Sequence, residues 1–167
     1  MDPRYSSCVH TQLPTPDASL GGRASVAWSQ VAVFASAVDS SLDKWLADTY
    51  RLGLTEFRAL TFLSQASDKE LRVNDLAQCV GLNPSSATRL VSRLEAKELA
   101  RRDVCEDDGR GVYAVIEQHG EALLKEVRTS YEVRVQELLS RPAVHFPHLD
   151  ARLIAAALTE VGALVTP

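Results

Sequence analysis

Three segments of the chain carry apolar residues at intervals of three and four, the period of an amphipathic helix. The first segment contains Trp28, Val31, Ala35, Val38, Leu42 and Trp45. The other two lie near the C-terminus and contain Leu124, Val127, Tyr131 and Leu138, then Ile154, Leu158, Val161 and Val165. A core of roughly 70 residues cannot bury three such stripes by itself. We therefore expect part of each to pack within the chain and part against a second copy.

Between these segments, residues 71–116 predict two short helices around a tight turn, followed by a β-hairpin. Gly81 falls where the chain must turn with positive φ, and the small Ala77 lets one helix cross closely over the next. Asn83 suits an N-cap and Pro84 the first helical position. The second helix, predicted over 84–97, buries one stripe made of Ala87, Leu90, Val91 and Leu94.

The opposite face of this second helix contains no acidic residue and carries Ser85, Ser86, Thr88, Arg89, Ser92 and Arg93. Serines at a helix N-terminus suit a phosphate, because free N–H groups point there. Arginines one turn apart suit guanine O6 and N7 in a DNA major groove. The alternative is an ordinary amphipathic helix with a solvated polar face.

A β-hairpin is predicted directly after this helix, with strands over 101–104 and 111–116. Asp108-Gly109 is a strong two-residue turn signal. Arg110 would project from the tip, where an arginine suits a narrow minor groove, and Asp108 would hold its guanidinium. A plain surface Asp/Arg pair is the alternative for these two residues.

Residues 54–125 resemble the winged-helix core of the multiple antibiotic resistance regulator (MarR) family. The matching segments are LTEFRALTFL, LRVNDLAQCVGLNPSSATRLVSRLEAKEL, ARRDVCEDDGR and GEALL. The resemblance implies a mainly α fold with a small β-wing, in which a winged helix-turn-helix core is flanked by N- and C-terminal dimerisation helices. Its parts would be a flexible tail over 1–22, a dimerisation helix over 23–52, the DNA-binding core over 53–117 and C-terminal dimerisation helices over 118–167.

The same resemblance implies function. Members are homodimeric DNA-binding regulators, mostly repressors, often released by small aromatic acids or by oxidation. The helix over 84–97 would read the major groove of a pseudo-palindromic operator, with the wing over 101–116 at the minor groove. Composition suggests an effector pocket for an aromatic or phenolic molecule, although aromatic residues at this spacing are more often core. Its lining would be Trp28, Phe34, Trp45, Tyr50, Arg51 and Phe57.

Three features depart from the family pattern. Glu98 stands where glycine usually follows the recognition helix, and a non-glycine residue in a left-handed cap costs up to ~1 kcal/mol. The sequence Ile116-Glu117 replaces the usual Leu-Thr, and the wing tip has an additional glycine at position 111. None of these changes removes a residue expected to contact DNA.

Charge leaves a rival function open. The formal net charge is −4, and residues 72–113 contain seven basic and seven acidic residues, so no uniformly basic surface is expected. A winged helix that binds an acidic protein partner therefore remains the alternative. An enzyme is not expected, because the chain shows no phosphate loop, nucleophile elbow or metal-ligand cluster.

The remaining candidate chemistry is limited. Cys8, Cys79 and Cys105 are an odd, scattered set that predicts free thiols, with Cys79 part-buried, and leaves oxidant sensing open. No cofactor or metal is expected. Neither an apolar run of membrane-spanning length nor a signal peptide is evident, so we expect a cytoplasmic protein.

Overall fold

The computed structural model describes residues 22–104 and 111–166. These residues fall into two compact units, of which one contains residues 22–34 and 150–166 and the other residues 35–149. The long helix α1 (Arg23–Tyr50) contributes its first part to the former unit and its second part to the latter.

The terminal unit consists of the first part of α1 and of α7 (Ala151–Val165). Asp150 caps α7, and its carboxylate accepts hydrogen bonds from the backbone N–H groups of Arg152 and Leu153 at 2.8 and 3.3 Å. Four apolar side chains of this unit are buried: Ala27, Phe34, Ile154 and Ala157. Six others are exposed: Trp28, Val33, Leu153, Leu158, Leu164 and Val165.

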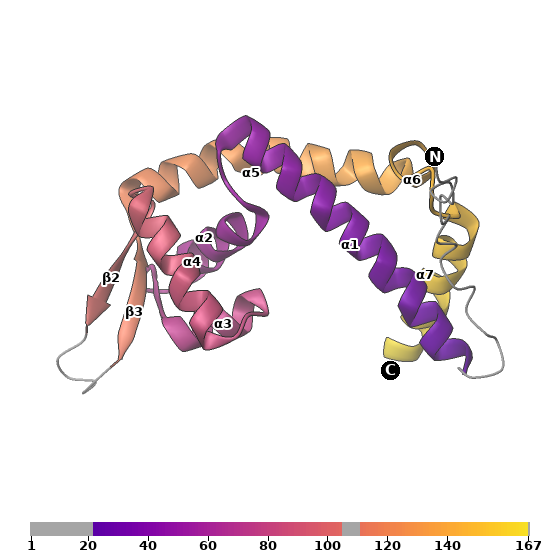
Figure 1. Cartoon of the computed structure of the whole chain (residues 1–167), viewed down its shortest axis with the longest axis horizontal. Coiled ribbons are helices and arrows are strands. Elements are labelled where there is room, and N and C mark those ends of the chain that lie inside the picture. Colours follow the sequence, from indigo (N-terminus) through magenta and orange to yellow (C-terminus); the bar gives the residue numbers. More distant parts are fainter. Residues whose placement is uncertain (1–21, 105–110, 167) are drawn as a thin grey trace, which may run out of the picture. The chain divides into compact units, whose positions relative to one another are not determined.

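The central unit contains the second part of α1 and five further helices (Figure 1). These are α2 (Leu54–Gln65), α3 (Val73–Val80), α4 (Pro84–Ala96), α5 (Gln118–Ser140) and α6 (Pro142–His145). Its core is mainly leucine, with valine, alanine and a few larger apolar residues. The largest fully buried side chains are Leu46, Leu52, Leu60, Leu63, Leu76, Leu90, Val91, Leu94, Val127 and Leu138.

A three-stranded antiparallel sheet lies beside α4, with strand order β1-β3-β2 (Figure 1). Its strands are β1 (Glu70–Arg72), β2 (Ala100–Val104) and β3 (Val112–Ile116). The first of these corrects the sequence interpretation, which placed Leu71 and Arg72 in a helix. Leu71 instead pairs with Ala114, and α3 begins at Val73. A strand of three residues has no periodicity of its own and forms here because β3 supplies its hydrogen-bonding partner.

The predicted turn between α3 and α4 is confirmed. Gly81 has φ 71° and ends α3 in the left-handed region, and the Leu82 N–H donates to the Ala77 carbonyl at 2.8 Å. The side chain of Asn83 caps α4 by accepting from the Ser86 N–H at 2.8 Å. The predicted stripe of Ala87, Leu90, Val91 and Leu94 has no exposed surface at all.

Two further expectations have different outcomes. Glu98 adopts φ 57°, so the left-handed cap after α4 is present although the residue is not glycine. Cys79 was expected to be part-buried and is exposed, because it lies on the face of α3 opposite Val73, Leu76 and Ala77, which pack into the core. Over the described ranges, no helix is both long and apolar enough to cross a membrane.

Candidate nucleic-acid interface

The outward face of α4 is polar, as the sequence predicted. Ser85, Thr88, Arg89, Ser92 and Arg93 are exposed, and Ser86 is half-buried beside the cap. Arg89 makes no hydrogen bond or ion pair with any residue in the described ranges, so its guanidinium is available to a ligand.

The hydroxyl groups on this face lie against the helix backbone. Thr88 donates to the Pro84 carbonyl at 3.0 Å, and Ser92 donates to the Thr88 carbonyl at 3.1 Å. A hydroxyl that donates in this way keeps lone pairs for a further donor. These two side chains therefore present acceptors on the outer face of α4.

Arg102, on β2, fastens the hairpin to α4. Its Nη2 donates to the Thr88 carbonyl at 3.0 Å and to the Ser92 hydroxyl. Its Nε lies 3.4 Å from the carboxylate of Glu95, which also accepts from the backbone N–H of Arg102 at 3.0 Å. Arg102 is not among the site residues predicted from the sequence. Nothing in the local pattern signals it, since its partners lie seven to fourteen residues away on another element.

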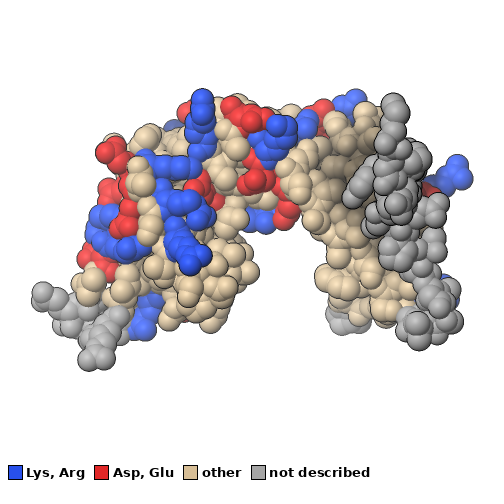
Figure 2. Space-filling view, viewed as in Figure 1, with Lys and Arg blue, Asp and Glu red and all other residues tan. Residues whose placement is uncertain are grey.

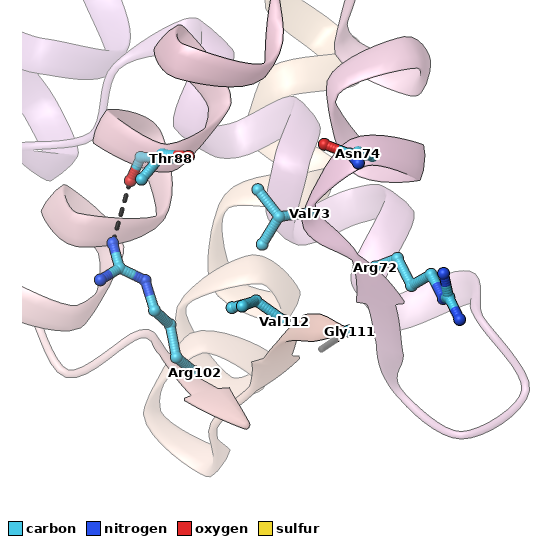
Figure 3. Close-up of a pocket in the computed structure, with 7 residues that line it drawn as sticks. All are labelled: Arg72, Val73, Asn74, Thr88, Arg102, Gly111 and Val112. Carbon is cyan, nitrogen blue, oxygen red and sulfur yellow. Dashed lines mark hydrogen bonds between the residues drawn. The ribbon is translucent and has the colours of Figure 1, made fainter. Parts of the chain in front are cut away.

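A groove of about 480 Å³ lies between the start of α3, the face of α4 and the hairpin (Figure 3). Val73 and Val112 point toward each other across it, and Arg102 reaches Thr88 along one side. Its lining residues are Arg72, Val73, Asn74, Thr88, Arg102, Gly111 and Val112. Arg72 donates from Nε to the Tyr113 hydroxyl at 3.0 Å, with its guanidinium carbon 5.7 Å from the centre of the Tyr113 ring.

The second arginine of α4 is placed differently from the first. Arg93 Nε lies 3.3 Å from Oε1 of Glu56, a buried carboxylate on α2, and Lys97 pairs with Oε2 of the same group. Burial of the carboxyl favours its neutral form. Hydrogen bonds from Lys97, the Gly53 N–H and Arg93 outweigh that effect and lower the pKa of Glu56 below its ordinary value.

Positive and negative side chains alternate over this part of the molecule. Figure 2 shows Lys and Arg gathered over the region of α4 and β2, with Asp and Glu among them. At the base of the hairpin, Arg101 pairs with Asp103 and lies 3.0 Å from Glu117, and its hydrogen bond lowers the pKa of Asp103. The predicted wing-tip residues Asp108 and Arg110 lie outside the described residues, as do Cys8 and Cys105.

Four of the six predicted effector-pocket residues lie in the central unit, where the three aromatic ones belong to two separate ring contacts. Trp45 packs edge-on against Tyr50 at 5.5 Å, and Phe57 contacts Tyr131 of α5 at 4.3 Å. Arg51 lines a groove with Arg93 and Lys97. Trp28 is exposed and Phe34 is buried in the terminal unit. A pocket shared by all six residues stays a prediction.

Comparison with known proteins agrees with this geometry. Residues 52–111 match the model of the MarR family. A comparison with curated protein sequences gave no match. Among solved structures, AbsC, a MarR family transcriptional regulator from Streptomyces coelicolor, has a TM-score of 0.65 at 23% identity, covering 84% of this chain and 90% of that one. Sco3205 from the same organism, a MarR family transcriptional regulator solved in complex with DNA, has a TM-score of 0.67 at 22% identity, covering 84% of each chain.

Wild-type MarR from E. coli is also similar, with a TM-score of 0.59 at 17% identity over 83% of this chain and 96% of that one. At these identities the solved structures establish the fold. They confirm the expected class, mainly α with a small β-wing in a winged helix-turn-helix core. The match over 52–111 is to the same family that the sequence resembled, and it covers the segment that contains α2, α3, α4 and β2.

Proposed function

We propose that this chain, whose segment 52–111 is a MarR-family winged helix, is a sequence-specific DNA-binding transcriptional regulator. The observation that carries the proposal is the face of α4. Its inner stripe is fully buried, while its outer face presents hydroxyl groups and the guanidinium of Arg89, which has no partner among residues 22–104 and 111–166. An α-helix with such a face fits a major groove, where arginine forms two hydrogen bonds with guanine.

The contacts divide into two kinds. Arg89 lies in the middle of α4 and is assigned to base edges. Ser85 and Ser86 lie at its N-terminus and are assigned to phosphates. The remaining candidate contacts lie near Arg89 on the same face of α4, and they are Thr88, Ser92 and Arg93. Arg102 holds the hairpin against α4, so the helix and the wing would meet DNA as one body. The relative Sco3205, which was solved bound to DNA, supports this assignment by its shared fold.

The proposal includes a homodimer. The terminal unit leaves six large apolar side chains exposed, among them Trp28 at 60% and Val165 at 76%, more than its own two helical segments bury. A second copy would cover them by two-fold symmetry. The operator would then be pseudo-palindromic, with half-sites about one helical turn apart, roughly 34–36 Å. Bound at a promoter, such a dimer would act as a repressor by excluding polymerase.

The proposal is tested with the full chain and fluorescently labelled fragments from upstream of its own gene. We expect tight binding to one fragment in fluorescence polarisation. Arg89→Ala should weaken that binding by about 1–3 kcal/mol, or roughly 5- to 150-fold. The matched control is Arg128→Ala, an exposed arginine on α5 outside the interface.

Equal affinity of wild type and Arg89→Ala for the preferred fragment would refute the assignment of base reading to α4. No binding to any fragment at low salt, with the dimer intact, would favour the rival function. That rival is a module that binds an acidic protein, and the alternating charges over α4 and β2 are the observation in its favour.

A further inference from the structure

Among the described residues, Glu56 is the one charged or polar residue that is buried, with 4% of its surface exposed. It lies in the first turn of α2, yet two of its three donors come from elsewhere in the chain. Its Oε2 accepts from the Gly53 N–H at 2.9 Å, which closes the start of α2. Its other partners are Arg93 and Lys97, at the far end of α4.

The same contacts fasten α4 to the junction of α1 and α2. Lys97 donates not only to Glu56 but also to the backbone carbonyl of Arg51 at 2.8 Å. Arg51 has φ 55°, so the chain turns sharply at the point where Lys97 is held. The end of the candidate reading helix is thereby tied to two fixed acceptors, of which one carries a charge.

The exposure of the three side chains shows where this charge acts. The side chain of Glu56 is 5% exposed, whereas the side chains of Arg93 and Lys97 are 54% and 38% exposed. Both cations therefore lie at the surface with a counter-charge beneath them. By contrast, Arg89, one turn earlier on α4, has no carboxylate partner in the described ranges.

This difference matters for any protein that searches DNA. Each cation free to neutralise a phosphate strengthens binding to every sequence alike, whereas base contacts strengthen binding to one sequence. The buried carboxylate of Glu56 pairs with both Arg93 and Lys97 and offsets one of their two charges, which reduces binding to phosphates of any sequence. The base contacts assigned to Arg89 are unchanged.

We infer that Glu56 is a positioning residue for sequence discrimination: by holding Arg93 and Lys97 and offsetting one of their two positive charges, it keeps non-specific phosphate binding weak relative to base reading by Arg89. The inference rests on the proposed DNA-binding function. It assigns to a residue of α2, outside the helix-turn-helix itself, control over the ratio of specific to non-specific affinity.

The test is a salt titration of DNA binding by the full-length protein, wild type and Glu56→Gln, on the preferred fragment and on a scrambled duplex. Glutamine can still accept from the Gly53 N–H but carries no charge. Glu56→Gln should steepen the dependence of log K on log salt for the scrambled duplex by up to about 0.9, since the substitution removes one negative charge. At low salt it should bind the scrambled duplex about tenfold more tightly, and the specific to non-specific ratio should fall accordingly.

Glu98→Gln is the matched control, because it removes the same charge two residues beyond the end of α4 from an exposed side chain without a partner in the described ranges. It should leave the slope nearly unchanged. In the double variant, Glu56→Gln with Arg93→Gln, most of the added slope should disappear, because the net charge of the cluster returns to its wild-type value. A purely structural role of Glu56 predicts the opposite sign, since a loosened α4 would bind every duplex more weakly.

Each outcome is decisive. An unchanged or shallower slope in folded Glu56→Gln, with wild type still discriminating between the duplexes, would overturn this inference alone. Failure of wild type to bind either duplex would overturn both the inference and the proposed function. If Glu56→Gln does not fold, Arg93→Gln and Lys97→Gln replace it. Each should reduce the wild-type slope on the scrambled duplex by less than the roughly 0.9 expected for a cation that is free to neutralise a phosphate, and a reduction of that full size would refute the inference.

Discussion

Gly120 lies directly against the backbone of Leu99, where a Cβ on residue 120 would overlap the Leu99 carbonyl group. The same carbonyl accepts from the Glu117 N–H at 3.0 Å, so the start of α5 is seated on the residue that leads into β2. The contact joins the helix that leaves the winged core to the base of the hairpin. Only glycine permits this approach, which accounts for the glycine in the GEALL segment.

Gly120→Ala should therefore destabilise the protein. The methyl group must displace backbone atoms rather than the end of a flexible side chain, and such overpacking costs about 1–3 kcal/mol. Urea denaturation followed by circular dichroism measures the loss. Gly162→Ala on α7 is the control, because nothing lies within 4 Å of its Cβ, and alanine should there stabilise the helix by up to ~1 kcal/mol. Equal effects of the two substitutions would show that α5 is not seated on Leu99.

The two left-handed residues that bracket α4 should respond in opposite directions. Gly81→Ala introduces a Cβ at φ 71° and should cost about 1 kcal/mol or more. Glu98→Gly relieves a side chain held at φ 57° and should gain up to ~1 kcal/mol. Thermal melts of both variants beside wild type provide the comparison. A destabilised Glu98→Gly would mean that the Glu98 side chain contributes a contact larger than its backbone strain.

Asn83→Ala should weaken α4 at its first turn. The side chain of Asn83 accepts from the Ser86 N–H, and loss of such a cap costs about 1 kcal/mol. Chemical denaturation measures this cost. Ser85→Ala separates stability from function, because its exposed side chain makes no intramolecular hydrogen bond in the described ranges. It should leave the denaturation midpoint unchanged while weakening binding to DNA. A shifted midpoint in Ser85→Ala would argue against its assignment to phosphate.

The contribution of Glu56 to stability should disappear in acid. Its pKa is lower in the folded protein than the ordinary value of 4.5, because its three donors outweigh the effect of burial. The ionised carboxylate therefore stabilises the fold fully above that ordinary value, and the stabilisation is lost as the pH falls through the lowered pKa. Free energies of unfolding for wild type and Glu56→Gln should differ at pH 7 and converge below about pH 4.5.

Glu98→Gln is the comparison for this measurement, as its exposed carboxylate has no partner in the described ranges. Its difference from wild type should stay small across the same pH range. A gap between wild type and Glu56→Gln that persists unchanged at pH 3 would indicate that packing of Glu56, rather than its charge, stabilises the junction of α2 and α4.

Features that depend on neighbours along the chain could be predicted from the sequence. The Gly81 turn, the Asn83-Pro84 start of α4 and its buried stripe each follow from backbone geometry within a few residues. The polar face of α4 followed for the same reason, since a helical period places every fourth side chain on one side. The pairing of β2 with β3 could also be predicted from the sequence, because a hairpin joins strands that are close together in the chain.

Features that depend on residues distant in sequence were decided by the tertiary structure alone. Strand β1 forms because β3 provides its hydrogen-bonding partners. Arg102 reaches α4 because the hairpin packs against that helix. The two arginines of α4 look equivalent in the sequence, yet only Arg93 meets the carboxylate of Glu56, 37 residues away. The periodicity of the sequence determines which side chains share a helix face. The partner of a charged side chain, however, is the group that tertiary packing places within a few ångströms of it. That distance is set only when α2 and α4 are packed together.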